Sequence, residues 1–245
     1  MKPLHFLLVT GLSLMALGSS PVSAQLPDSP ETQSQETIKD LMWQGAQASL
    51  FSDYRKAEAL LRQALALEPK DLLDRLAILN NLGNAVSGQG RYAEAELYYR
   101  QAIKLAPEDG LAASSLVNMY LKQSNLYQRE ERYDKAEAVL MRLRELDSDR
   151  MNQALAELYS FQGARYRDQG RYEEAEATLL KGLELENPPA LSYASLGYFY
   201  HVRDRYEESI AAYEQALEID PNNPNIRGGL ENVRQDLQWR DRSSP

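Results

Sequence analysis

The sequence predicts an all-α fold in which five similar helical hairpins stack into a solenoid. A short phrase recurs at a nearly constant period, apolar residues follow helical spacing, and no alternating run is long enough for a strand. The phrase reads SDYRKAE, GRYAEAE, ERYDKAE, GRYEEAE and DRYEESI in its five copies. Successive tyrosines are 38, 41, 39 and 34 residues apart (Tyr54, Tyr92, Tyr133, Tyr172, Tyr206). Periods of this size are typical of units that bury one face only against a neighbouring unit.

The first 24 residues differ from the rest of the chain and predict a cleaved signal peptide. A positive start at Lys2 precedes an apolar run over residues 6–17, and small residues at 22–24 suit a signal peptidase. As a helix, this run is too short to span about 30 Å of hydrocarbon. Residues 25–36 are rich in Pro, Ser, Thr and Gln and predict a flexible leader.

Composition argues against several classes of function and partner. The net charge of −9 and the pI of about 4.9 disfavour nucleic acid and anionic membranes, which are themselves negative. The chain has no cysteine, so disulfides and thiolate chemistry are excluded. It also has no Asn-x-Ser/Thr acceptor, which favours a bacterial envelope over a eukaryotic secretory route. We therefore expect an exported protein, periplasmic or secreted, with no membrane insertion after signal removal.

Each unit is expected to form a helix, a turn and a second helix. Nine residues before each tyrosine and three residues after it the side chain is small, which lets the two helices approach closely. Proline stops three of the second helices (Pro69, Pro107, Pro221). The expected units span residues 38–71, 76–109, 117–150, 156–189 and 190–223. Residues 224–240 predict a capping helix with a polar outer face, and residues 241–245 a tail.

This pattern resembles the tetratricopeptide repeat (TPR) family. Residues 81–83 (NLG), 92–95 (YAEA) and Pro107 together form a near-complete copy of its motif. The third unit departs furthest, with Ser124 in place of glycine and Ser148 in place of proline. The extra residues before the early first helices look like the kinesin-light-chain variety of the repeat. The resemblance implies a right-handed TPR superhelix whose first helices line a concave groove for an extended peptide.

The resemblance also implies which residues point into that groove. In each unit, the residue that directly follows the small residue of the first helix is expected to point into the groove. These residues form one column of the repeat alignment (Ala46, Asn84, Asn125, Ala164, Tyr198). Asparagine both donates and accepts hydrogen bonds, so Asn84 and Asn125 are candidates for binding a peptide main chain. The alternative is that a solvated groove merely tolerates asparagine there. Asn80, Tyr198 and His201 complete the candidate set. The carboxylate clamp of some TPR proteins is absent, because its basic positions are here Asn80, Ser160 and Ala164.

Little in the sequence indicates an enzyme, a cofactor or a metal. One histidine, His201, remains after signal removal, and no His/Asp/Glu cluster has metal-ligand spacing. No glycine-rich phosphate loop follows a strand. We expect a non-enzymatic, monomeric module, without cofactor or metal, that binds a peptide or protein segment. The main alternative is a structural subunit or scaffold of a cell-envelope assembly that uses the convex face or the capping helix. A third possibility is a module that presents a substrate to a separate enzyme.

Overall fold

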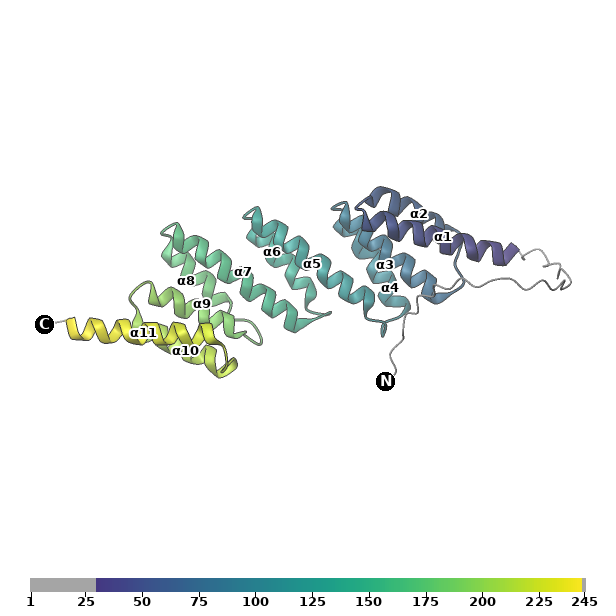
Figure 1. The fold of residues 1–245 in the computed structure, drawn as a ribbon. Coiled ribbons are helices and arrows are strands. Elements are labelled where there is room, and N and C mark those ends of the chain that lie inside the picture. The colour runs from purple at the N-terminus through teal and green to yellow at the C-terminus, as the bar shows by residue number, and fades with distance from the viewer. Residues whose placement is uncertain (1–29, 244–245) are drawn as a thin grey trace, which may run out of the picture.

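The computed structural model describes residues 30–243, which fold into eleven α-helices and contain no strand (Figure 1). The predicted all-α solenoid is therefore confirmed, while the expected signal peptide lies outside the described residues. The helices pair as α1 (Pro30–Leu50) with α2 (Tyr54–Ala66), α3 (Leu72–Gly88) with α4 (Tyr92–Leu105), α5 (Leu111–Arg129) with α6 (Tyr133–Leu140), α7 (Ser148–Asp168) with α8 (Tyr172–Lys181), and α9 (Ala190–His201) with α10 (Tyr206–Ile219), followed by α11 (Pro224–Ser243). A 3-10 turn, Met141–Leu143, extends α6.

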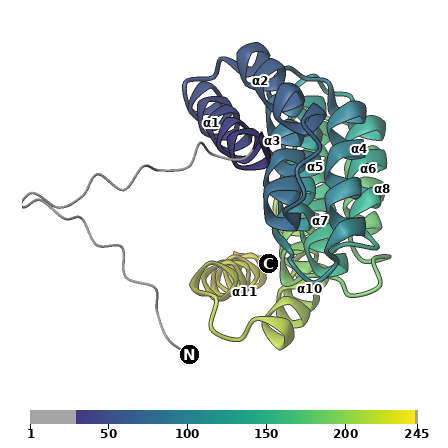
Figure 2. The same ribbon diagram turned by 90° about the vertical axis from the view of Figure 1, so that its right-hand side faces the viewer.

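The five hairpins form two layers of helices. Seen nearly end-on, α3, α5 and α7 make one layer and α4, α6 and α8 the other (Figure 2). Helices α1 and α11 lie on the open side of the first layer, near its two ends. We call the side formed by α1, α3, α5, α7 and α9 the first-helix face. It is the face that the resemblance predicts to be concave.

The second helix of every unit begins at the repeat tyrosine because the chain turns sharply just before it. Two residues before each tyrosine the backbone is left-handed, with φ between 56° and 78° (Ser52, Gly90, Glu131, Gly170, Asp204). Glycine occupies this position without steric cost in two units, whereas the other three place a side chain there. The turn geometry is thus shared by all five units although the glycine is not.

Small residues of the first helix make room for large residues of the second. A Cβ added at Gly83 would lie 2.5 Å from the Tyr99 ring, and one at Gly163 would lie 2.7 Å from Leu179. The same relation joins Gly45 to Leu61 and Gly197 to Tyr213. The large residue stands seven positions after the repeat tyrosine, a column that the sequence reasoning did not identify. The small residues three positions after the tyrosine are all fully buried, as expected (Ala57, Ala95, Ala136, Ala175, Ser209).

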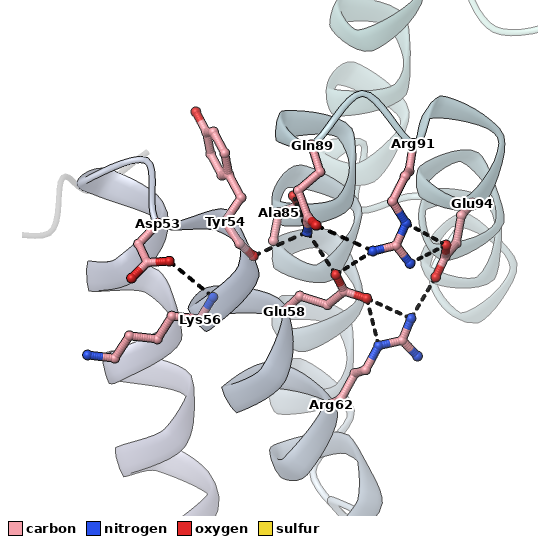
Figure 3. Close-up of polar contacts among 9 residues, drawn as sticks. All are labelled: Asp53, Tyr54, Lys56, Glu58, Arg62, Ala85, Gln89, Arg91 and Glu94. Atoms are coloured by element: carbon pink, nitrogen blue, oxygen red, sulfur yellow. Dashed lines mark hydrogen bonds and ion pairs between the residues drawn. The ribbon is translucent and has the colours of Figure 1, made fainter.

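A carboxylate between the first two units connects them through charged hydrogen bonds (Figure 3). Glu58 of α2 accepts hydrogen bonds from Gln89 at 2.7 Å, Arg91 at 2.6 Å and Arg62 at 2.9 Å. Both arginines also pair with Glu94 of α4. Burial alone would raise the pKa of Glu58, but these hydrogen bonds hold the pKa below its usual value. The network thus joins α2 to the turn before α4.

The structure corrects the prediction at both ends of the repeat array. Helix α1 begins at Pro30, so the described part of the predicted leader (25–36) is helical, not flexible. Proline suits the first position of a helix, Glu31 in the first turn pairs with Lys70, and Ile38 is buried. At the other end α11 continues to Ser243, into the predicted tail.

Helix α11 covers the C-terminal end of the solenoid. It buries Ile226, Leu230 and Val233 in one cluster with Tyr213 and Ala216 of α10. Its outer positions are mostly polar and exposed, as a cap requires. Across residues 30–243, no helix combines the length and the apolar character needed to cross a membrane.

Candidate functional site

Two hollows lie on the first-helix face. The N-terminal hollow, about 340 Å³, is lined from α1, α3 and α5, and the C-terminal cavity, about 740 Å³, from α7, α9 and the start of α11. Second-helix residues such as Tyr99 and Tyr213 form their floors. The two hollows differ in chemistry: most residues that line the first are polar, whereas the surface of the second is mainly apolar.

The N-terminal hollow presents hydroxyl, amide and ammonium groups. None of the described residues that line it is Asp or Glu, although the whole chain is acidic. Its polar lining from the first helices comprises Ser49, Asn84, Ser87, Ser115, Asn118 and Lys122. The Ser49 hydroxyl is buried and has no hydrogen-bond partner among the described residues. The hollow therefore suits a ligand that is rich in hydrogen-bond acceptors, such as peptide carbonyl groups.

Asn84 lines this hollow and is oriented by the core beneath it. The ring of Tyr99 is buried against Gly83, and its hydroxyl donates a hydrogen bond of 2.8 Å to Asn84 Oδ1. Burial raises the pKa of Tyr99 well above its usual value, so the hydroxyl keeps its proton. This hydrogen bond uses one of the two lone pairs of the amide oxygen and orients the side chain. The NH₂ group of Asn84 and the second lone pair of its oxygen are left for a ligand.

The other two asparagines occupy different environments. Asn125 is exposed on α5, and no group in the described part of the chain hydrogen-bonds its side chain, but it does not line either hollow. Asn80 is only 7% exposed and its Oδ1 has no partner among residues 30–243. Asn80 is therefore a buried residue and is not available to a ligand at the surface.

Tyr198 and His201 stand on α9 but face different neighbours. Tyr198 is 48% exposed and lines the C-terminal cavity, where the guanidinium of Arg167 lies 5.1 Å from the centre of its ring. His201 is instead joined to the capping helix, with Nε2 2.7 Å from Asp236 Oδ2. Tyr198 thus lines a cavity, whereas His201 connects α9 to α11.

Sequence reasoning missed the C-terminal cavity. Twelve residues before the repeat tyrosine, the first three units carry the larger residues Met42, Asn80 and Leu121, but the last two carry Ser160 and Ala194. Both of these small residues line the cavity. The decrease in side-chain volume along this column in the last two units could have indicated the cavity from the sequence.

The described residues contain no cluster of three or more His, Cys, Asp or Glu side chains that could hold a metal ion. Several carboxylates are instead occupied in ion pairs with arginine at helix starts. Arg91–Glu94, Arg171–Glu174 and Arg205–Glu208 repeat the same i,i+3 pair in three units. These pairs recur with the repeat, which is typical of a structural role.

Comparison with known proteins identifies the repeats. Two models described as tetratricopeptide repeat match the chain, one at residues 77–109 and 190–223 and the other at residues 117–150 and 156–188. These stretches make up more than half of the sequence. No curated protein matches the sequence.

Solved structures that match the chain include a thermophilic TPR protein of Thermus thermophilus. It is 22% identical over 81% of this chain and 99% of its own, with a TM-score of 0.33. A tetratricopeptide repeat protein of Parabacteroides merdae is 18% identical over 81% and 99%, with a TM-score of 0.34. MamA of Desulfovibrio magneticus is 17% identical over 77% and 98%, with a TM-score of 0.35. At these TM-scores the likeness carries no argument, and the family assignment rests on the repeat models.

Proposed function

Because the chain belongs to the tetratricopeptide repeat family, whose members generally act in protein–protein interaction, we propose that it binds a peptide or protein segment along the first-helix face. One observation supports this proposal most directly: both hollows described above lie on that face. Tetratricopeptide repeats are typically non-enzymatic, and we propose no catalytic role. On the sequence of residues 1–24 we further propose that the protein acts outside the cytoplasm, in a bacterial periplasm or after secretion.

The N-terminal hollow would bind the main chain of the ligand. Peptide carbonyl groups can accept hydrogen bonds from the exposed Asn84 amide and Lys122 ammonium. Contacts to the main chain provide affinity without reading sequence, so specificity must come from another part of the face.

The experiment starts from a pull-down with the mature chain, beginning at Gln25, in an envelope extract of the native host. The captured partner is then titrated by calorimetry against wild type and Asn84→Asp. This substitution keeps an oxygen acceptor for the Tyr99 hydroxyl but removes the NH₂ donor. Binding should weaken by roughly 1–3 kcal/mol for each ligand group left unpaired. The control is Asn125→Asp, which adds the same charge at an exposed position outside both hollows.

Equal loss of affinity in both variants would show a charge effect, and unchanged affinity in Asn84→Asp would remove Asn84 from the site. Melting curves of both variants show whether folding is retained. Asn84→Ala is a poor choice here, because it would leave the buried Tyr99 hydroxyl without its acceptor.

One observation favours the alternative role as a structural subunit. Large apolar side chains are exposed near both ends of the solenoid, with Trp43 62% and Phe51 77% exposed at the first unit and Trp239 72% exposed on α11. Exposed aromatic residues are enriched in protein interfaces. Light scattering over a range of protein concentrations separates the two roles. A monomer at all concentrations supports the free binding module, and an oligomer that Trp239→Gln or Trp43→Gln dissociates supports the subunit.

A further inference from the structure

We propose that the C-terminal cavity is the anchor site of the first-helix face and takes a large apolar side chain, aromatic or leucine-like, of the bound peptide. This inference rests on the proposed peptide-binding function and names the class of peptide. The cavity would select among peptide side chains, which main-chain contacts in the N-terminal hollow cannot do.

The walls of the cavity are mainly apolar. Leu191, Ala194 and Phe199 come from α9, Leu179 from α8 and Ile226 from α11. The volume of about 740 Å³ lies within the range of about 300–1,000 Å³ that is usual for ligand pockets. Such a volume accommodates one large side chain together with the adjoining main chain. Removing that side chain and these walls from water is the favourable term in binding.

Small residues from two neighbouring first helices line the cavity. They are Ser160 and Ala164 of α7 and Ala190 and Ala194 of α9. Larger residues occupy the position of Ser160 and Ala194 in the first three units. The space is therefore specific to the C-terminal end and is not a general property of the repeat.

Several polar groups of the lining have partners within the protein. Arg167 donates to Asp168 at 2.7 Å and lies over the ring of Tyr198. Asp220 accepts one hydrogen bond of 3.0 Å from the side chain of Asn223. The hydroxyls of Ser160 and Ser195 are 2.7 Å apart and hydrogen-bond each other. An apolar side chain loses less hydration than a charged one on entering this mainly apolar cavity.

Tyr198 stands at the cavity with almost half of its surface exposed. One side of its ring is covered by the Arg167 guanidinium, which holds the ring in place. The exposed part of the ring can pack against an aromatic or leucine-like side chain of a peptide. Tyr198, a groove candidate from the sequence, thus becomes one wall of the anchor site.

The test uses a phage-displayed library of random peptides, selected on the mature protein. The consensus peptide is synthesised and titrated by calorimetry against wild type, Ala164→Leu, Ala194→Leu and Ala46→Leu. The first two variants fill the cavity from α7 and from α9. Ala46 occupies the same column as Ala164 but is exposed on α1 and does not line the cavity, so Ala46→Leu is the matched control. Leucine is nearly as good a helix former as alanine, which keeps the helices intact.

We expect the selected peptides to share one large apolar residue. Its replacement by alanine in the peptide, or either cavity-filling variant, should weaken binding roughly tenfold or more, as is usual for an anchor residue. Ala46→Leu should bind as wild type does. Selected peptides without such a residue, or undiminished binding to both folded cavity-filling variants, would overturn the anchor site and leave groove binding intact. Failure to select any peptide would overturn both. The alanine-substituted peptide tests the inference even if a protein variant misfolds.

Discussion

Replacing Glu58 by glutamine should loosen the junction between the first two units. The carboxylate is only 12% exposed and accepts hydrogen bonds from Gln89, Arg91 and Arg62 (Figure 3). Glutamine has the same size but carries no charge, and its NH₂ group cannot accept from the arginines. A hydrogen bond to a charged group contributes about 1.5–3 kcal/mol. Since both arginines retain Glu94, we expect a net loss of about 1–2 kcal/mol in unfolding free energy at pH 7.

The pH dependence of this effect has a definite sign. The pKa of Glu58 in the folded protein is lowered below the ordinary value of 4.5. Its contribution to stability is therefore fully present above that ordinary value and is lost as the pH falls through the lowered pKa. Glu58→Gln has no carboxyl to titrate at this position. The difference in stability between wild type and variant should be largest near neutral pH and should close in acid.

Urea unfolding followed by circular dichroism, at neutral pH and at several acidic values, measures the difference. Glu145→Gln is the control, because Glu145 is exposed and makes no ion pair within residues 30–243. If the difference in unfolding free energy between wild type and Glu58→Gln stays constant from neutral pH into acid, the electrostatic origin of the effect is refuted. Equal midpoints at pH 7 would show that the network contributes nothing to stability.

Three further outcomes test the packing and the processing of the chain. Ala175→Leu should lower the unfolding free energy by roughly 1–3 kcal/mol, because Ala175 is fully buried where α8 packs closely on α7. The close approach is seen at Gly163, where an added Cβ would lie 3.4 Å from the Ala175 carbonyl oxygen. An unchanged urea midpoint would contradict this packing. Gly170→Ala should cost about 1–2 kcal/mol, because φ is 75° there, whereas Gly228→Ala, at a helical position with open space, is the control. N-terminal sequencing of protein from the native host should show a soluble chain starting at Gln25, and a start at Met1 in a membrane fraction would remove the proposal of export.

The repeat phrase was sufficient to predict the all-α solenoid, because each copy marks the start of a second helix. The tyrosine is the first residue of α2, α4, α6, α8 and α10. Local composition was less informative at the N-terminal end. The segment from Pro30 to Glu36 has the residues of a flexible linker, yet it continues the helix that Ile38 anchors in the core. A contact between residues distant in the sequence, such as Glu31 with Lys70, cannot be inferred from linker composition.

The sequence predicted which repeat positions carry the candidate residues, but it did not predict whether each side chain is buried, exposed or paired. Asn80 and Asn84 stand one turn apart on α3, yet one is buried and the other is exposed. Their residue type and spacing are equally suited to a groove, so only the neighbouring helices distinguish them. His201 was likewise a groove candidate, but α11 places Asp236 against it. The capping helix lies outside the repeats, so its contacts cannot be predicted by aligning the repeat units.

The second-helix column that fills the hairpins also determines what the first-helix face can bind. In the second unit the residue is Tyr99, long enough for its hydroxyl to reach Asn84 and to orient that amide. In the fourth and fifth units it is Leu179 and Tyr213, and both line the C-terminal cavity. The same position therefore contributes to both hollows while its side chains pack on glycines of the first helices. A substitution at this position alters the hairpin core and the binding surface together, which limits how freely the ligand preference of such a face can change.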